Sequence, residues 1–164
     1  MRDLWHAGTG ASDNASSVAT MMEAMRILKI LKLPMQRTVQ IALWGGEECG
    51  ILGSREYVEK HVNSEHAKVS ICINRDSGAG RLRGVFLMEN KKLAPIFARW
   101  MEPFHYLGFT TLRSRVQGGD HLHFRYLGIV TTSFLQDQYP SWASHTNMDT
   151  LRGLLRQISS SQLR

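Results

Sequence analysis

The sequence predicts an α/β domain whose central sheet is mostly parallel. Short β-like runs alternate with amphipathic helical segments along the chain, which is the pattern of layered α/β folds. Acidic residues follow directly on two of these runs, at 47–48 and at 76. Such sheets bind ligands beyond the carboxyl ends of their strands. The chain shows no internal repeat, low-complexity tract or linker, so we expect one domain over residues 1–164.

The first part of the chain predicts a loop, a helix and a strand. Residues 2–14 are rich in turn formers and predict a loop. From Ala15 the pattern is helical, and Pro34 is expected to end the helix. Residues 38–44 predict a buried strand, and residues 51–61 predict a helix. The long helix has one apolar face, which we expect to be core rather than a cofactor site, formed by Val18, Met21, Met22, Met25, Leu28 and Leu31.

The second part continues the alternation. A helix is predicted at 91–107, and Pro103 should end or kink its last turn. The tail from 151 to 164 is weakly helical and basic. Further strands are predicted at 68–74, 84–88, 110–116 and 129–134.

Composition indicates a soluble globular protein. The 164 residues suffice for one real core, and 43% hydrophobic with 21% charged residues is ordinary. The net charge of +6 comes from 20 basic and 14 acidic residues that are scattered along the chain. Because no aromatic–basic module accompanies this charge, we expect no nucleic-acid partner, and that hypothesis rests on charge alone. No apolar run is long enough to span a membrane.

The two cysteines, Cys49 and Cys72, form no disulfide framework and no zinc-finger spacing. We interpret them as buried free thiols, with Cys49 as a thiolate ligand the alternative, because it adjoins Glu48. The sequence contains no signal peptide, so the protein is either cytoplasmic or a piece of a longer one. Localisation therefore stays unknown.

Acidic and histidine side chains gather in the predicted loops. Carboxylate and imidazole together suit zinc or another divalent metal. Glu47 and Glu48 are adjacent and repel each other, and a metal ion beside a general base would account for the pair. The alternative is that these loop acids are only solvated. The set comprises Asp3, His6, Asp13, Glu47, Glu48, Asp76, Asp120, His121, His145 and Asp149.

Five segments in order resemble the co-catalytic zinc exopeptidases, the bacterial leucyl aminopeptidase and carboxypeptidase Q-like metallopeptidases. The resemblance runs from about residue 3 to residue 150. It implies a three-layer αβα sandwich with a mostly parallel, mixed sheet. The segments are Gly8–Ser16, Leu43–Glu48, Asn74–Asp76, Asp120–His121 and His145–Thr150.

The resemblance implies a role for each matching residue. Asp13 matches the carboxylate that bridges two zinc ions, and the bond between it and the next residue is expected to be cis. Glu48 and His145 match ligands of the first ion, and Asp76 matches a ligand of the second. Glu47 matches the general base, which takes a proton from metal-bound water and passes it to the leaving amine. The implied reaction is hydrolysis at the end of a short peptide.

One expected ligand is missing. Asp3 matches the aspartate of the family's His-x-Asp pair, but Met1 stands where the histidine is expected. The second ion then keeps only Asp13 and Asp76, unless His6 substitutes. The sequence is thus compatible with either one or two bound zinc ions.

Other residues have two readings. Asp149 either holds the His145 imidazole or is a plain turn acid, and Asp120 and His121 either line a substrate pocket or form a structural turn. We expect the remaining histidines to be surface or packing residues: His6, His61, His66, His105 and His123.

The family domain is normally longer at both ends, so we expect an incomplete fold truncated at both ends. Two functions follow: a zinc exopeptidase, or a catalytically impaired homologue that serves as a metal-binding or interaction module. The sequence does not choose between aminopeptidase, carboxypeptidase and dipeptidase specificity, and it leaves the oligomeric state open.

Overall fold

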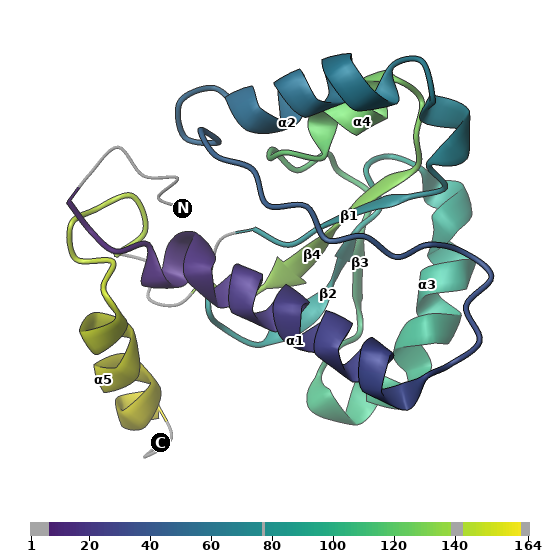
Figure 1. Ribbon diagram of the computed structural model, residues 1–164. Helices are drawn as coiled ribbons and strands as arrows, with labels where there is room; N and C mark the ends of the chain where they lie inside the picture. Colours follow the sequence, from purple (N-terminus) through teal and green to yellow (C-terminus); the bar gives the residue numbers. More distant parts are fainter. Residues whose placement is uncertain (1–6, 77, 139–142, 162–164) are drawn as a thin grey trace.

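A computed structural model describes residues 7–76, 78–138 and 143–161, and it has the expected α/β architecture. Helices lie on both faces of a four-stranded sheet (Figure 1). In chain order the elements are η1 Ala11–Ala15, α1 Ser16–Leu31, α2 Leu52–Tyr57, η2 Val58–Val62, η3 His66–Lys68, β1 Cys72–Asn74, β2 Leu82–Phe86, η4 Lys91–Leu93, α3 Ala94–Met101, η5 Glu102–Leu107, β3 Thr111–Arg113, α4 Leu122–Tyr126, β4 Thr131–Gln136 and α5 Leu151–Ser161.

The sheet has the strand order β1-β4-β2-β3 and is mostly parallel. β1 pairs with β4 in parallel, and β2 pairs with β3 in parallel. The central pair, β2 and β4, is antiparallel and carries an irregularity between Leu82 and Gly84. The mixed sheet that the sequence predicts is therefore confirmed.

Strand alternation assigns the two faces of the sheet. Val85 lies in register with Leu112 and Phe134, and all three pack in one cluster with Phe97 and Met101 of α3. Neighbouring strand residues point to the opposite face. There the second cluster, which contains Val58, Val62, Phe124 and Ile129, packs against Cys72 of β1. Helices thus cover both sides, which gives the expected three layers.

The predicted strand at 38–44 is wrong. These residues belong to no helix or strand, and within the described chain they join no strand ladder. A strand exists only where a neighbour pairs with its backbone N–H and C=O groups. The end of the segment is packed, where the ring centroid of Trp44 lies 5.8 Å from that of Tyr57 and 5.7 Å from that of Phe124.

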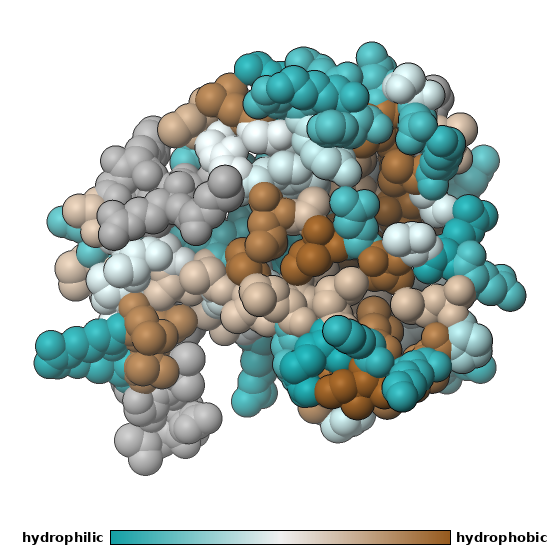
Figure 2. All heavy atoms as spheres, viewed as in Figure 1, coloured by the Kyte–Doolittle hydropathy of each residue, from teal (hydrophilic) through white to brown (hydrophobic). Residues whose placement is uncertain are grey.

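The predicted helix is present as α1, but its apolar face is not core, which corrects the expectation. Val18, Met21, Met25 and Leu28 are only half-buried, while Met22 and Leu31 are 57% and 56% exposed. The main contacts of α1 are with η1, which directly precedes it, so the apolar stripe is covered only in part. Figure 2 shows apolar side chains gathered on this face, over α1 and the segment that follows it.

Proline ends the predicted helix at 91–107 where expected, since α3 stops at Met101 and η5 continues as a 3₁₀ turn around Pro103. The short helix α4 was not predicted from the sequence. Among the described residues, no helix combines the length and apolar character that crossing a bilayer requires.

Candidate metal centre

Three side chains from distant parts of the chain meet at one point. A ligand atom from each of Asp13, Glu48 and His145 lies within 4.8 Å of the other two. His145 Nε2 is 2.8 Å from Glu48 Oε1 and 3.2 Å from Asp13 Oδ2. The two carboxylates are buried, whereas the imidazole is 53% exposed. The group is therefore open on the histidine side.

Asp13 is fixed by its backbone. It lies in η1, which follows Gly10 in the left-handed conformation (φ 65°), and the bond between Asp13 and Asn14 is cis, as expected. The carboxylate of Asp149 accepts hydrogen bonds from the backbone N–H groups of Ser12 (2.7 Å) and Asp13 (2.9 Å). The hydroxyl of Ser144 donates to Asp13 Oδ2 at 3.0 Å. These bonds hold one carboxylate oxygen toward the other ligands.

Asp149 thus supports Asp13 rather than the ring of His145. It is 1% exposed, and its own carbonyl accepts hydrogen bonds from the N–H groups of Thr9 and Gly10. Neither the role of Asp149 nor the contact from Ser144 was foreseen, because both join residues more than a hundred positions apart. The motif at 145–150 indicates that Asp149 is a candidate site residue, but it does not reveal which groups Asp149 bonds to.

Glu47 and Glu48 lie in a tight turn before α2. Gly46 has a φ of 75°, and the N–H groups of Gly50 and Ile51 donate to the carbonyl of Glu47 at 3.0 and 2.8 Å. Gly53 packs against the turn so closely that an added Cβ would lie 2.4 Å from the carbonyl oxygen of Gly45. The turn is therefore rigid, and it presents Glu48 to the cluster with Glu47 beside it.

His145 takes an uncommon backbone conformation for a residue other than glycine, with φ 61°. The surrounding turn is closed by Thr146, whose N–H and hydroxyl both donate to the carbonyl of Ala143, at 3.1 and 2.8 Å. Ala143 is 1% exposed and anchors the turn. The imidazole is thus held over the two carboxylates by a short, well-bonded loop.

Asp76 follows β1 but is not part of the three-residue group. It lies near Gly119, where an added Cβ would be 3.2 Å from Asp76 Oδ2, 3.0 Å from Asn74 Nδ2 and 3.4 Å from His121 Nδ1. His121 is completely buried, with Nε2 3.3 Å from Met88 Sδ. His121 is therefore a packed residue, while its neighbour Asp120 is half-buried.

Burial, together with the positive charge of Arg125, lowers the pKa of His121 to about 4, although a backbone hydrogen bond with Gln117 acts in the opposite direction. The imidazole is therefore neutral at physiological pH.

Both cysteines are free, as expected, but Cys49 is exposed, which contradicts the expected burial, and Cys72 is half-buried. Cys49 is not one of the three clustered ligands. Burial raises the pKa of Cys72 to about 12, with the charge of Asp120 adding to the shift. Two other candidates, Asp3 and His6, lie outside the described residues.

The donor set fits a zinc ion. Two carboxylates and one imidazole are ordinary zinc ligands, and three protein ligands with one open position are typical of catalytic rather than structural sites. The exposed imidazole leaves that fourth position toward solvent.

Two carboxylates and an imidazole at one point form a ligand set that metal-dependent hydrolases use. Within that class, the sequence model of Peptidase family M28 matches residues 2–160, so the chain belongs to this family of metallopeptidases.

Curated relatives resemble the chain along nearly its whole length. Carboxypeptidase Q of Mus musculus is 29% identical over 150 residues, which are 91% of this chain and 32% of that protein. Aminopeptidase YwaD of Bacillus subtilis is 28% identical over 159 residues, 90% of this chain and 34% of that protein. The chain thus spans about a third of the length of these relatives.

Solved structures agree with the fold. A peptidase M28 precursor from Shewanella amazonensis superposes with a TM-score of 0.79 at 29% identity, over 93% of this chain and 35% of that one. The Bacillus subtilis zinc aminopeptidase BSAP gives 0.72 at 22% identity, over 95% and 42%. The second likeness concerns the fold alone.

Proposed function

We propose that this chain carries the centre of a zinc-dependent exopeptidase that hydrolyses the terminal bond of short peptides. The observation that carries the proposal is the convergence of Asp13, Glu48 and His145, with Glu47 adjoining Glu48 in the same rigid turn. Membership of Peptidase family M28 supports it, as do relatives named as an aminopeptidase and a carboxypeptidase.

In this proposal the three clustered side chains hold one zinc ion. When bound, zinc polarises the peptide carbonyl and lowers the pKa of its water toward about 7. Glu47 then acts as the general base: its carboxylate accepts the proton of the attacking water and returns it to the leaving amine. The hydrogen-bonded turn fixes the backbone of Glu47, which directly precedes the ligand Glu48.

We propose one ion rather than two. Asp13, Glu48 and His145 gather around one point, which is enough for one ion. Met1 stands where the histidine of a second site is expected, so that site would keep only Asp13 and Asp76. A single ion per chain is therefore the expected stoichiometry.

Metal analysis and kinetics on matched variants test the proposal. Purified chain should retain about one zinc ion after dialysis, since the three clustered ligands form one site. Glu48→Ala and His145→Ala should each weaken zinc binding by at least about tenfold. Glu47→Ala should keep the zinc and lose about a hundredfold or more in hydrolysis of short peptides. Glu59→Ala, an exposed glutamate of η2, should change neither.

The alternative is a catalytically impaired homologue that only binds metal or a partner. The observation that favours it is Met1, which stands where the resemblance expects a histidine ligand. Zinc binding without hydrolysis above the Glu47→Ala level would establish it. Absence of zinc in the wild-type chain would overturn the proposal itself.

A further inference from the structure

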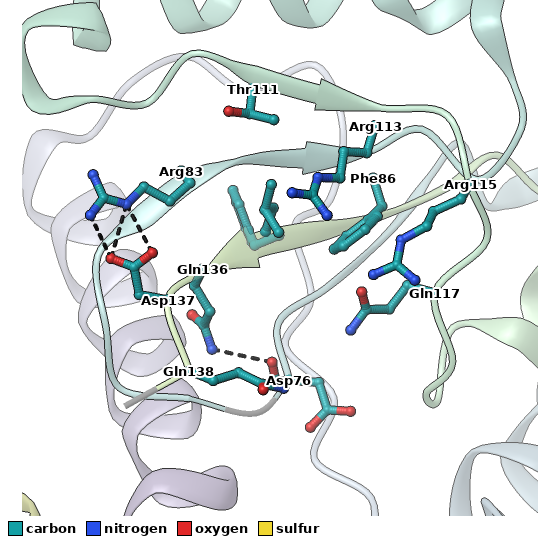
Figure 3. Close-up of a pocket in the computed structure, with 12 residues that line it drawn as sticks. Asp76, Arg83, Phe86, Thr111, Arg113, Arg115, Gln117, Gln136, Asp137 and Gln138 are labelled. Atoms are coloured by element: carbon teal, nitrogen blue, oxygen red, sulfur yellow. Dashed lines mark hydrogen bonds and ion pairs between the residues drawn. The ribbon is translucent and has the colours of Figure 1, made fainter. Parts of the chain in front are cut away.

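A positively charged pocket lies beside the candidate metal centre, and the proposed mechanism does not use it. The pocket has a volume of about 490 Å³, which is in the usual range for small-ligand sites. Asp76 forms part of its wall, and the carbonyl of the preceding Arg75 accepts a hydrogen bond at 3.4 Å from the side chain of Asn14, which follows the ligand Asp13, so the pocket and the centre are neighbours. Its arginines come from β2, β3 and the residues after β3 (Figure 3).

Strand alternation builds one wall of this pocket. Thr111, Arg113, Arg115 and Gln117 are two residues apart and all line it. Between the first two, Leu112 packs on the opposite face against α3. Figure 3 shows the guanidinium groups of Arg113 and Arg115 directed from that wall toward the middle of the pocket.

The charges of the pocket do not balance. Arg83 is already satisfied, since its guanidinium makes three hydrogen bonds of 2.6–2.9 Å with the carboxylate of Asp137. The side chains of Arg113 and Arg115 form no hydrogen bond or ion pair with any residue of the described chain. Arg115 instead stacks 5.0 Å from the ring centroid of Phe86, which is 2% exposed. Two guanidinium groups thus remain to bind an anion.

The geometry favours a carboxylate. A guanidinium presents paired N–H donors that match a planar carboxylate, and stacking on an aromatic ring fixes the orientation of that plane. An unblocked peptide held at the neighbouring centre brings such a group at its C-terminus, and an acidic side chain supplies another.

We propose that Arg113 and Arg115 bind a carboxylate of the peptide substrate in this pocket, and that this contact sets which short peptides the site accepts. The inference rests on the proposed function, because that function supplies the peptide. The proposed contact implies that peptides without a free carboxylate bind weakly to this site.

Calorimetric titration with defined dipeptides tests the inference apart from catalysis. The full chain carrying Glu47→Gln, which lacks the proposed base, is titrated with Ala-Ala, with Ala-Ala amide and with Glu-Ala amide in the presence of zinc. We expect at least one of the two carboxylate-bearing probes to bind about tenfold or more tightly than Ala-Ala amide. Preference for Ala-Ala assigns the C-terminal carboxylate, and preference for Glu-Ala amide assigns the acidic side chain.

Arginine variants on the same background complete the test. Arg113→Gln and Arg115→Gln should each remove most of that preference, and Arg113→Lys should restore it only in part because lysine lacks the paired donors. Arg37→Gln removes the same charge from an exposed position elsewhere and should have no effect. Equal affinity for all three dipeptides, or equal effects of Arg37→Gln and the pocket variants, would overturn the inference. Failure of the proposed function would show separately, in zinc content and in wild-type hydrolysis.

Discussion

At the scale of single residues, the candidate centre depends on a carboxylate that is not among its ligands. Asp149 is buried and accepts two backbone N–H groups, from Ser12 and from the ligand Asp13. Hydrogen bonds to a charged acceptor are stronger than those between neutral groups. Asp149 therefore ties the loop that carries His145 to the loop that carries Asp13, and ligand spacing depends on it.

Replacing Asp149 by asparagine should destabilise the chain. The asparagine amide can accept at only one oxygen and would turn its NH₂ group toward a backbone N–H. We expect the free energy of unfolding to fall by about 2 kcal/mol, because charged hydrogen bonds contribute about 1.5–3 kcal/mol. Urea denaturation of Asp149→Asn measures this. Glu65→Gln, which breaks an exposed ion pair with Lys68, serves as the control and should change little. Equal losses in both variants would contradict the role of Asp149.

At the scale of elements, β2 and β3 approach so closely that only glycine fits between them. An added Cβ at Gly84 would lie 1.7 Å from the carbonyl oxygen of Thr111. The pairing of these strands positions Arg113, which lies in register with Phe86. The pocket wall that contains Arg113 therefore requires a residue without a Cβ atom at position 84.

Gly84→Ala should separate β3 from β2. We expect it to lower the free energy of unfolding by about 3 kcal/mol, the upper end of the usual cost of overpacking, because the clash is with backbone. It should also weaken binding of carboxylate-bearing dipeptides. Gly118→Ala is the matched control, since nothing lies within 4 Å of its added Cβ. The test is to measure the urea denaturation midpoint of both variants. Similar midpoints would contradict the prediction.

Elements that local sequence specifies could be predicted, and those that need a distant partner could not. Pro103 acts on its own helix, so the change from α3 to η5 was visible in the sequence. The segment 38–44 has the composition of a strand but pairs with no described strand, so its prediction failed. The ligands Asp13, Glu48 and His145 were predicted from motifs, whereas the pocket arginines required the strand register, which motifs do not reveal.

At the scale of the whole molecule, buried and exposed apolar surface are distributed unevenly. Two clusters pack on opposite faces of the sheet, and one of them includes helix α3. On the apolar face of α1, Met22 and Leu31 are 57% and 56% exposed, and Met35 in the segment after it is 54% exposed. A periodic pattern tells that a helix is amphipathic, but not whether another layer covers it.

Global stability should fall in mild acid because of His121. Its folded-state pKa is lowered to about 4 from the ordinary 6.5, chiefly by burial. Below pH 6.5 the unfolded chain binds a proton that the folded chain does not, so the free energy of unfolding decreases from pH 6.5 to pH 4 and is unaffected above that range. The pKa difference corresponds to a loss of about 3 kcal/mol at pH 4.

Denaturation of variants across pH isolates this contribution. His121→Gln should be less stable at pH 7 but should lose about 3 kcal/mol less than the wild type between pH 7 and pH 4. His61→Gln, at an exposed position, should retain the wild-type dependence. Parallel curves for the wild type and His121→Gln would show that His121 does not carry the effect.

The unequal environments of the two thiols make the chain suitable for single-site labelling. Thiolates react and thiols do not, so Cys72, with its pKa raised to about 12, should resist maleimide reagents at neutral pH. Cys49 is exposed and adjoins Glu48. Mass spectrometry should find one adduct per wild-type chain and none in Cys49→Ser. A fluorophore attached to Cys49 would lie one residue from the proposed ligand Glu48. Its signal should therefore respond to zinc binding, and no reporter cysteine has to be added.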